Sequence, residues 1–263
     1  MRNPAAGLTV ILPCAGSGTR LGLKGPKELF EILPEVCLID LSLAHIRAVL
    51  PTNDIKVAVV IRPHKEEVVD HVRRVLPGIK VETVFFNDSY YEWPGSVFSA
   101  RETFSNHNLV LLPDSILNVG KNTVNNEMGP ICRDDRGSSL IKLAADALSV
   151  HKVVFGWVKC SHPRVLKKVG ALRVEEDIVT AFQDKPVDSF EKYIGFWGCY
   201  AFRKEVGKSL YHFLVGSVRH RPVSLEEQPF HPAGAIPLHS YRDLGTWPVI
   251  RQFQQDYSHP NKI

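Results

Sequence analysis

Small residues and two cations follow the first apolar run of the sequence. The turn reads Cys14-Ala-Gly-Ser-Gly-Thr-Arg-Leu-Gly22, and Pro26-Lys-Glu28 comes shortly after it. Because glycine has no Cβ, successive backbone N–H groups in such a turn can approach an anion closely. The Arg20 guanidinium can fork across two phosphate oxygens, and Lys27 adds a second positive charge. Transfer of a phosphoryl group needs such a cradle, because negative charge grows on the leaving oxygens.

Two other phosphate-binding motifs are tested against the same turn. The dinucleotide fingerprint G-x-G-x-x-G would begin at Gly16 and would require glycine where Leu21 stands. The P-loop requires glycine, four spacer residues and then Gly-Lys-Ser or Gly-Lys-Thr, and this complete motif does not occur in the sequence. The turn therefore indicates a phosphate cradle of a different kind.

Two aspartates farther along the chain are candidate ligands of a hard cation. Asp114 follows the apolar run Leu109-Val-Leu-Leu112, and Asp243 lies in Arg242-Asp-Leu-Gly-Thr246. Carboxylate oxygens are the ligands that Mg²⁺ prefers. Each residue also has an ordinary structural interpretation, since an aspartate after a strand often caps a helix or lies in a solvated loop. Lys185, which precedes a proline, could likewise be a surface lysine.

In their order along the chain, these segments resemble the sugar-phosphate nucleotidyltransferase family, which includes glucose-1-phosphate thymidylyl- and uridylyltransferases and their cytidylyl relatives. The resemblance covers about residues 8–246. It rests on five segments: the turn with Pro26-Lys-Glu28, the strand leading to Asp114, Asp184-Lys-Pro186, Gly198-Cys-Tyr-Ala-Phe202 and Asp243-Leu-Gly-Thr246. The chain departs from the family pattern at Pro113, where glycine is usual, and at Asp184, which replaces glutamate.

The resemblance implies a role for each candidate residue. Arg20 would bind the β- and γ-phosphates and stabilise the departing pyrophosphate, and Lys27 would hold the α-phosphate and the sugar phosphate. Asp114 and Asp243 would chelate Mg²⁺. Lys185 would hold the sugar phosphate, whose attacking oxygen is already anionic and needs no general base. The other implied contacts are Leu12, Ala15, Gly16, Ser17, Gly18, Thr19 and Gly95 for the nucleotide, and Gly170 and Gly198 for the sugar.

The resemblance predicts an enzyme that joins a nucleoside triphosphate, UTP or dTTP, to a sugar 1-phosphate and releases pyrophosphate. A cytidylyltransferase acting on a non-sugar phosphate, such as an alditol phosphate, is the main alternative, because Pro113 and Asp184 indicate an unusual acceptor. A catalytically silent nucleotide-binding relative would lack one of the cations or carboxylates, whereas all four are present. A glycosyltransferase would carry an Asp-x-Asp motif, but the sequence reads Pro113-Asp-Ser-Ile116.

Strand and helix patterns alternate in the first half of the chain. Apolar runs of strand length cover residues 8–12, 55–61 and 109–112, and helical periodicity covers residues 38–49 and 65–76. In a parallel sheet, ligands collect at the carboxyl ends of the strands, where the turns after Leu12 and Leu112 lie. The second half predicts strands over residues 153–158, 169–174, 178–183 and 196–202, and a terminal helix over residues 247–257. The polar segment of residues 118–139 is long enough to be a functional loop.

We therefore expect an α/β fold, a three-layer sandwich with a mostly parallel, Rossmann-like mixed sheet. Residues 1–263 would form a single domain, with a nucleotide-binding half of about residues 1–117 and a sugar-phosphate-binding half of about residues 118–263. The family resemblance places Asp243 close to the end of the chain, so we expect a single activity without an appended β-helix.

Composition limits the classes of partner. The 263 residues carry a net charge of +4, and the basic residues are scattered, so we expect no nucleic-acid partner. The first apolar run is broken by Pro13 and Gly16, which argues against a signal peptide or a membrane span. The five cysteines contain no C-x-x-C pair, which favours reduced thiols and a cytoplasmic location over disulfides or a zinc site. Association into a homo-oligomer stays open.

Overall fold

A computed structural model describes residues 7–50, 54–119, 139–221 and 223–258 of the chain. Most of the polar segment predicted over residues 118–139 lies outside these ranges. None of the helices within them is long and apolar enough to cross a membrane.

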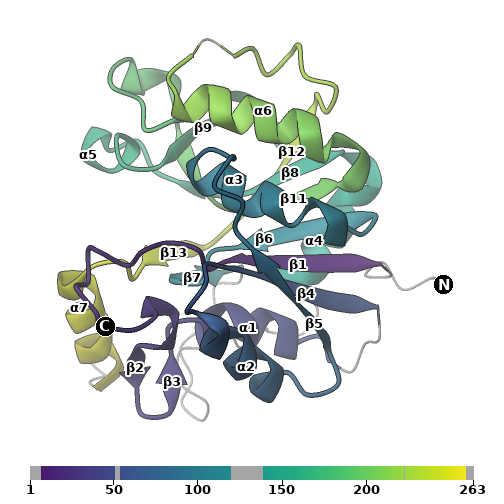
Figure 1. The fold of residues 1–263 in the computed structure, drawn as a ribbon. Helices are drawn as coiled ribbons and strands as arrows, with labels where there is room; N and C mark the ends of the chain where they lie inside the picture. Colours follow the sequence, from purple (N-terminus) through teal and green to yellow (C-terminus); the bar gives the residue numbers. More distant parts are fainter. Residues whose placement is uncertain (1–6, 51–53, 120–138, 222, 259–263) are drawn as a thin grey trace.

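A mixed nine-stranded sheet forms the centre of the molecule (Figure 1). Its first part is parallel, because β1 (Leu8–Pro13) pairs with both β4 (Ile55–Ile61) and β6 (His107–Leu111), and β5 (Lys80–Phe85) extends it beyond β4. The strands β1, β4 and β6 are largely buried and mostly apolar, as expected of strands covered on both faces. The predicted α/β class and mixed sheet are confirmed, and β1 occupies the expected interior position.

The second half of the sheet closes on itself, which the sequence did not predict. The strands are β8 (Val153–Lys159), β9 (Gly170–Glu175), β10 (Ile178–Asp184), β11 (Gly195–Arg203) and β12 (Ala233–Pro237). The sheet order β11-β8-β12-β10-β9 is completed by a direct pairing of β9 with β11. This half therefore forms a ring of five strands, joined to the parallel half through β11 and β6.

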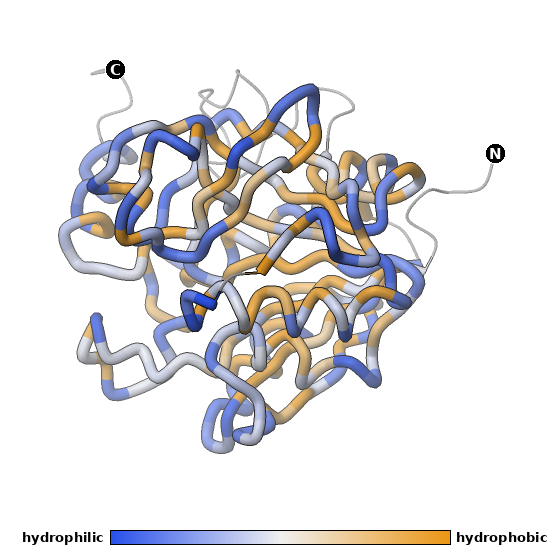
Figure 2. Tube along the Cα trace, turned by 90° about the horizontal axis from the view of Figure 1, so that it is seen from above, coloured by the Kyte–Doolittle hydropathy of each residue, from blue (hydrophilic) through white to orange (hydrophobic). Residues whose placement is uncertain are grey.

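Helices cover the two faces of the parallel strands. One apolar core contains α1 (Asp40–Arg47), α2 (Glu66–Val75) and α4 (Leu140–Val150), and the other contains α3 (Glu92–Ser99) and α6 (Gly207–Val218). Figure 1 shows α1 and α2 on the opposite side of the sheet from α3 and α6. The apolar segments run through the middle of the molecule in Figure 2, whereas the outer turns are hydrophilic. A short helix, α5, spans Pro163–Leu166.

A third apolar core joins the two ends of the chain. The terminal helix α7 (Trp247–Ser258) packs against the hairpin of β2 (Glu31–Leu33) and β3 (Val36–Cys37), as its buried residues share one cluster with Leu21, Ile32 and Leu38. The Trp247 indole N–H donates to the Leu21 carbonyl at 2.9 Å. Just before α7, β13 (Ser240–Asp243) pairs with β7 (Ser115–Asn118). These contacts place Asp243 close to the end of β6.

Candidate functional site

The glycine-rich turn reaches across the carboxyl ends of β1 and β6. Pro26 leads into a short 3₁₀ helix, Lys27–Leu29, from which the Lys27 ammonium binds the Asp114 carboxylate at 2.5 Å. Both side chains are largely buried. Burial by itself would lower the pKa of Lys27, but the Asp114 and Glu28 carboxylates together outweigh burial, so the pKa of this ammonium is raised. The loop therefore lies where the sequence placed it, and Lys27 stays charged beside Asp114.

Asp243 lies beside Asp114 although the two are 129 positions apart in the sequence. Asp243 pairs in register with Ser115, and the Leu244 N–H donates to the Asp114 carbonyl at 2.8 Å. Burial and the charge of Asp114 raise the pKa of the Asp243 carboxyl, against the opposing effects of the Gly245 N–H, Arg20 and Lys27. The two carboxylates thus repel each other at one place, and this is an arrangement that a divalent cation would stabilise.

Arg20 completes the charged group. Its guanidinium lies 3.9 Å from the Asp243 carboxylate, and its side chain is 62% exposed, so it stays accessible to a ligand. A Cβ at Gly245 would lie 3.0 Å from an Arg20 nitrogen and 2.8 Å from Asp243 Oδ1. Glycine at position 245 therefore makes the space in which the guanidinium approaches Asp243. Arg20, Lys27, Asp114 and Asp243 form what we call the charged cluster.

The β4–α2 turn supplies two further cations that the sequence analysis did not select. The Lys65 ammonium donates to the carbonyls of Cys14 at 2.6 Å and Gly16 at 3.0 Å, and Arg62 Nε donates to the Ala15 carbonyl at 3.2 Å. Lys65 also forms a buried ion pair with Glu28. The signal in the sequence was two basic residues directly after a buried strand, at the sheet edge where ligands collect.

The predicted nucleotide loop shows backbone that is open to a ligand. Leu12 is fully buried in β1, so only its main chain could contact a nucleotide, and Ala15 is nearly as buried. Gly16, Ser17 and Thr19 are exposed, while Gly18 has a φ of +67° and lies against the Lys27 side chain. The left-handed backbone at Gly18 therefore favours glycine, which explains the second glycine of the turn.

The three other predicted glycines are closely covered by the protein itself. A Cβ at Gly95 would lie 2.7 Å from Tyr90 Cβ, and one at Gly198 would lie 2.8 Å from the Tyr241 ring. A Cβ at Gly170 would lie only 1.8 Å from the Trp197 indole nitrogen. Among the described residues, that indole N–H has no hydrogen-bond partner. Close packing therefore explains glycine at these positions, and contact with a base or sugar stays a prediction that concerns their backbone.

Lys185 lies apart from the charged cluster. It follows β10 with a φ of +46°, its side chain is about half exposed, and its ammonium is 3.9 Å from the Asp184 carboxylate. Within the described ranges it contacts none of the four cluster residues. Burial raises the pKa of Asp184, and the Glu92 charge adds to this shift, whereas Lys185 and His220 oppose it. The structure thus places Lys185 in the second half, free to meet a ligand from that side.

Comparison with known proteins separates sequence from fold. The sequence matches no family model and no curated protein. Solved structures match along nearly the whole chain. UTP-bound UGPase from Acinetobacter baumannii has a TM-score of 0.69 at 12% identity, over 98% of this chain and 95% of that one. A UDP-glucose pyrophosphorylase complexed with UDP-glucose has a TM-score of 0.66 at 14% identity, over 97% and 100%. The inositol-1-phosphate CTP transferase from T. maritima has a TM-score of 0.62 at 15% identity, over 97% of each chain. The chain has the nucleotidyltransferase fold.

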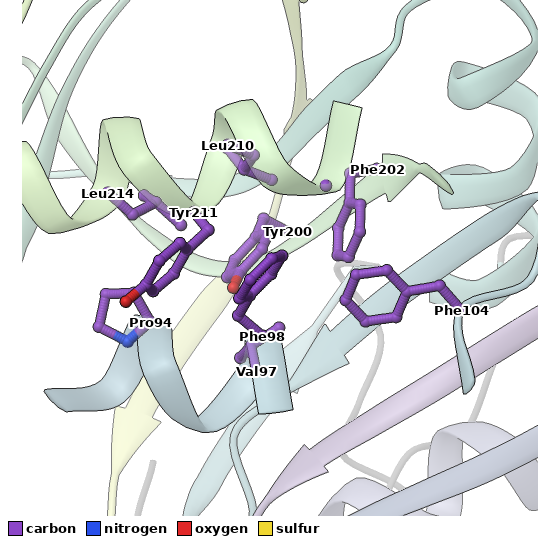
Figure 3. A pocket seen from close by; sticks show the side chains of 10 residues that line it. Pro94, Val97, Phe98, Phe104, Tyr200, Phe202, Leu210, Tyr211 and Leu214 are labelled. Atoms are coloured by element: carbon purple, nitrogen blue, oxygen red, sulfur yellow. The ribbon is translucent and has the colours of Figure 1, made fainter. Parts of the chain in front are cut away.

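Within this nucleotidyltransferase fold, the cavity between α3 and α6 is too small for a substrate. It has a volume of about 10 Å³, which is room for one water molecule, and aromatic rings line it (Figure 3). Phe98 and Tyr211 stack there with ring centroids 4.5 Å apart. The cavity is a gap between packed side chains, and the aromatic rings around it hold α3, the helix that carries Trp93 and Gly95. Trp93 in turn packs against Trp197, at 5.1 Å between centroids.

One further group of polar side chains lies outside the charged cluster. Donor atoms of Cys37, Asp40 and His71 lie within 4.8 Å of one another. The Asp40 carboxylate accepts hydrogen bonds from the Cys37 backbone N–H and pairs with His71 Nε2, each at 2.8 Å. These bonds satisfy Asp40 and tie β3 to α1 and α2, so the group has a structural role in this nucleotidyltransferase fold.

Proposed function

We propose that this protein is a nucleotidyltransferase that condenses a nucleoside triphosphate with a sugar 1-phosphate, giving a nucleotide-sugar and pyrophosphate. The observation that carries the proposal is the charged cluster: two cations of the glycine-rich loop meet two carboxylates from two distant segments, beside loop N–H groups that are open to a ligand. Fold likeness at 12–15% identity supports the architecture, and the cluster supports the chemistry.

The residues fit Mg²⁺. Asp114, which directly precedes β7, and Asp243, the last residue of β13, offer carboxylate oxygens beside each other, and the repulsion between them is the kind that a divalent cation relieves. Asp114 and Asp243 would hold the ion, which would neutralise charge on the triphosphate when bound. The Lys27 ammonium already pairs with the Asp114 carboxylate, so this carboxylate accepts a cation as its neighbour.

The chain's own residues would position the two substrates and stabilise the charge that develops during transfer. A phosphate oxygen of the sugar phosphate attacks the α-phosphorus, and the bond from the α-phosphorus to the oxygen that bridges to the β-phosphorus breaks. The attacking oxygen is anionic at neutral pH, so the side chains need to move no proton. Lys27 would neutralise the α-phosphate and Arg20 the leaving pyrophosphate, because each cation lies at the carboxyl ends of the strands. Lys185 would hold the sugar phosphate from the second half.

We keep UTP or dTTP as the proposed nucleotide, with the two halves of the chain as the nucleotide and sugar-phosphate sides of one domain. The T. maritima relative, an inositol-1-phosphate CTP transferase by name, favours transfer from CTP to a non-sugar phosphate as the second candidate, since it matches equally much of this chain. The silent-relative alternative is disfavoured, because the four charged residues are not only present but gathered. The free thiols of Cys14, Cys37, Cys160 and Cys199 support the proposed cytoplasmic location.

A pyrophosphate-release screen tests the proposal. UTP, dTTP, CTP, ATP and GTP would each be paired with a panel of sugar 1-phosphates, inositol 1-phosphate and alditol phosphates in the presence of Mg²⁺. We expect release with one pyrimidine triphosphate and one class of acceptor, and none from the variant that combines Asp114→Asn with Asp243→Asn. Release with CTP and an alditol or inositol phosphate would favour the second candidate. No release from any pair would contradict the enzyme assignment.

A further inference from the structure

Three consecutive carbonyl groups of the nucleotide loop are held by one turn of the chain. Lys65 binds the carbonyls of Cys14 and Gly16, and Arg62 binds the carbonyl of Ala15 between them. The loop follows β1, and Arg62 and Lys65 lie in the turn that connects β4 to α2. Because β1 and β4 are paired neighbours in the sheet, the loop and the turn lie side by side. Such repeated contacts on one loop indicate more than a single chance hydrogen bond.

The planar peptide bond gives these contacts a consequence. In a trans peptide the C=O of one residue and the N–H of the next point in opposite directions. Holding the carbonyls of residues 14, 15 and 16 therefore turns the N–H groups of Ala15, Gly16 and Ser17 away from the two cations. In the described part of the chain these three N–H groups donate to no acceptor, whereas the Cys14 N–H donates to Val60. A Cβ at Gly16 would meet nothing within 4 Å, so the space beside the loop is open.

Lys65 also connects the loop to Lys27. Its ammonium lies 3.0 and 2.8 Å from the two carboxylate oxygens of Glu28, the residue next to Lys27. The Glu28 side chain is fully buried and that of Lys65 is 13% exposed, so this is an interior ion pair. One ammonium thus fixes both the open N–H groups and the start of the 3₁₀ helix that presents Lys27.

We propose that Arg62 and Lys65 are positioning residues that orient the N–H groups of Ala15, Gly16 and Ser17 toward the nucleoside triphosphate and keep them in register with Lys27. The inference rests on the proposed function and deepens it, by naming residues that would set nucleotide affinity without touching the nucleotide. Arg62 donates to the loop and to Asp88, and Lys65 donates to the loop and to Glu28. Both side chains would therefore act on the nucleotide through the loop. Three aligned N–H groups make a site for an anionic group.

The experiment uses the full chain and two loop variants. Arg62→Met keeps a side chain over Phe86, on which the guanidinium now lies at 4.5 Å, but loses the bond to Ala15. Lys65→Met is combined with Glu28→Gln, so that no buried charge is left unpaired. Arg73→Met is the matched control, because Arg73 is a half-exposed arginine whose bonds go to Asp70 and Thr83. Arg62→Lys tests whether charge alone is sufficient.

Two readouts are taken on each variant. The first is the ¹⁵N order parameters of Ala15, Gly16 and Ser17, which need no ligand. The second is calorimetric affinity for UTP, dTTP and CTP with Mg²⁺, together with the KM for each substrate. We expect the loop order parameters to fall from about 0.85 to below about 0.6 in both loop variants. Triphosphate affinity should fall about tenfold to a hundredfold, while the KM for the sugar phosphate changes less than about twofold. Arg62→Lys should recover part of the loss, and Arg73→Met should behave as wild type.

Unchanged order parameters would overturn the inference, and so would unchanged triphosphate affinity in a loop that has become mobile. An equal rise in the KM for both substrates would also overturn it, because it would indicate general damage to the fold. If the wild-type protein binds no triphosphate, the proposed function fails together with the nucleotide-positioning role. The order parameters would still decide by themselves whether Arg62 and Lys65 hold the loop.

Discussion

The Lys27 ammonium lies 2.5 Å from the Asp114 carboxylate, and the pair is nearly enclosed, with 14% and 12% of the two side chains exposed. Asp243 adds a second carboxylate beside it. Lys27 therefore neutralises a site whose remaining charge is negative. A cation ligand would compete with Lys27 for the Asp114 carboxylate, and substrate phosphates would compete with Asp114 for the Lys27 ammonium. The pair therefore links protein stability to ligand binding.

Lys27→Met should reveal this linkage as a loss of stability. It leaves Asp114 buried without its partner, and breaking a buried pair in this way costs about 3–5 kcal/mol. Urea denaturation measures the free energy of unfolding. Millimolar Mg²⁺ should restore part of the loss, since it supplies positive charge to Asp114. Combining Lys27→Met with Asp114→Asn should restore most of it. A double variant as unstable as Lys27→Met would show that packing by the lysine stem, not charge, is what matters.

Arg20→Ala should separate catalysis from binding. The Arg20 side chain is largely exposed, and in the described part of the chain its guanidinium pairs with Asp243 beside Gly245, so its removal should leave the fold intact. We expect kcat to fall about a hundredfold or more, because the charge it would stabilise grows in the transition state. Nucleotide affinity should weaken less, since the loop N–H groups remain. Arg20→Lys should recover only part of the rate, because an ammonium cannot fork across two oxygens.

Steady-state turnover and calorimetry on the same preparations check this prediction. Arg251→Ala, an exposed arginine on α7, is the control and should be unchanged. Near-normal turnover with weakened binding would make Arg20 a docking residue only. Normal values for both quantities would mean that Arg20 does not face the substrate.

Asp184→Asn should change how stability depends on pH. Burial, with the Glu92 charge, raises the pKa of Asp184 above its ordinary value of 3.8. The native state therefore binds this proton more tightly than the unfolded chain does, and Asp184 makes stability fall as pH rises from about 3.8 through the raised pKa. Asparagine does not titrate, so the variant should be the more stable protein at neutral pH. The difference should shrink as the pH falls through the raised pKa toward 3.8, and it should stay constant at lower pH. Urea denaturation from pH 3 to pH 8 measures it, and a difference independent of pH would contradict the assignment.

Gly170→Ala should destabilise the five-stranded ring. The new methyl group would lie 1.8 Å from the Trp197 indole nitrogen, so the indole must move, at a cost of about 1–3 kcal/mol. Combining it with Trp197→Leu should relieve the overlap and recover part of the loss. Gly25→Ala is a suitable control, because nothing lies within 4 Å of its added methyl group and its backbone is not left-handed. Equal stability of the Gly170 and Gly25 variants would show that Trp197 has room to turn away.

Much of the first half could be predicted from the sequence because its signals are local. A buried parallel strand is a short apolar run, so the predicted strand over residues 55–61 agrees with β4, and the predicted strand over residues 8–12 is one residue shorter than β1. Glycine followed by Arg20 and Lys27 predicts an anion-binding turn from residue types alone, and this role stays a prediction. The family resemblance also predicted that Asp114 and Asp243 meet, and the structure pairs β7, which begins directly after Asp114, with β13, which ends at Asp243.

The tertiary structure alone decided the contacts that join distant segments. No periodicity in the sequence reports these contacts. They are the pairing of Lys27 with Asp114, the bonds of Lys65 to the carbonyls of Cys14 and Gly16, and the pairing of β9 with β11. Gly170 is a second example of what the sequence leaves open. The sequence shows a residue without a side chain, and only the fold shows that Trp197 fills the space beside it. Residue type fixes what a group can do, but its partner depends on how the whole chain packs.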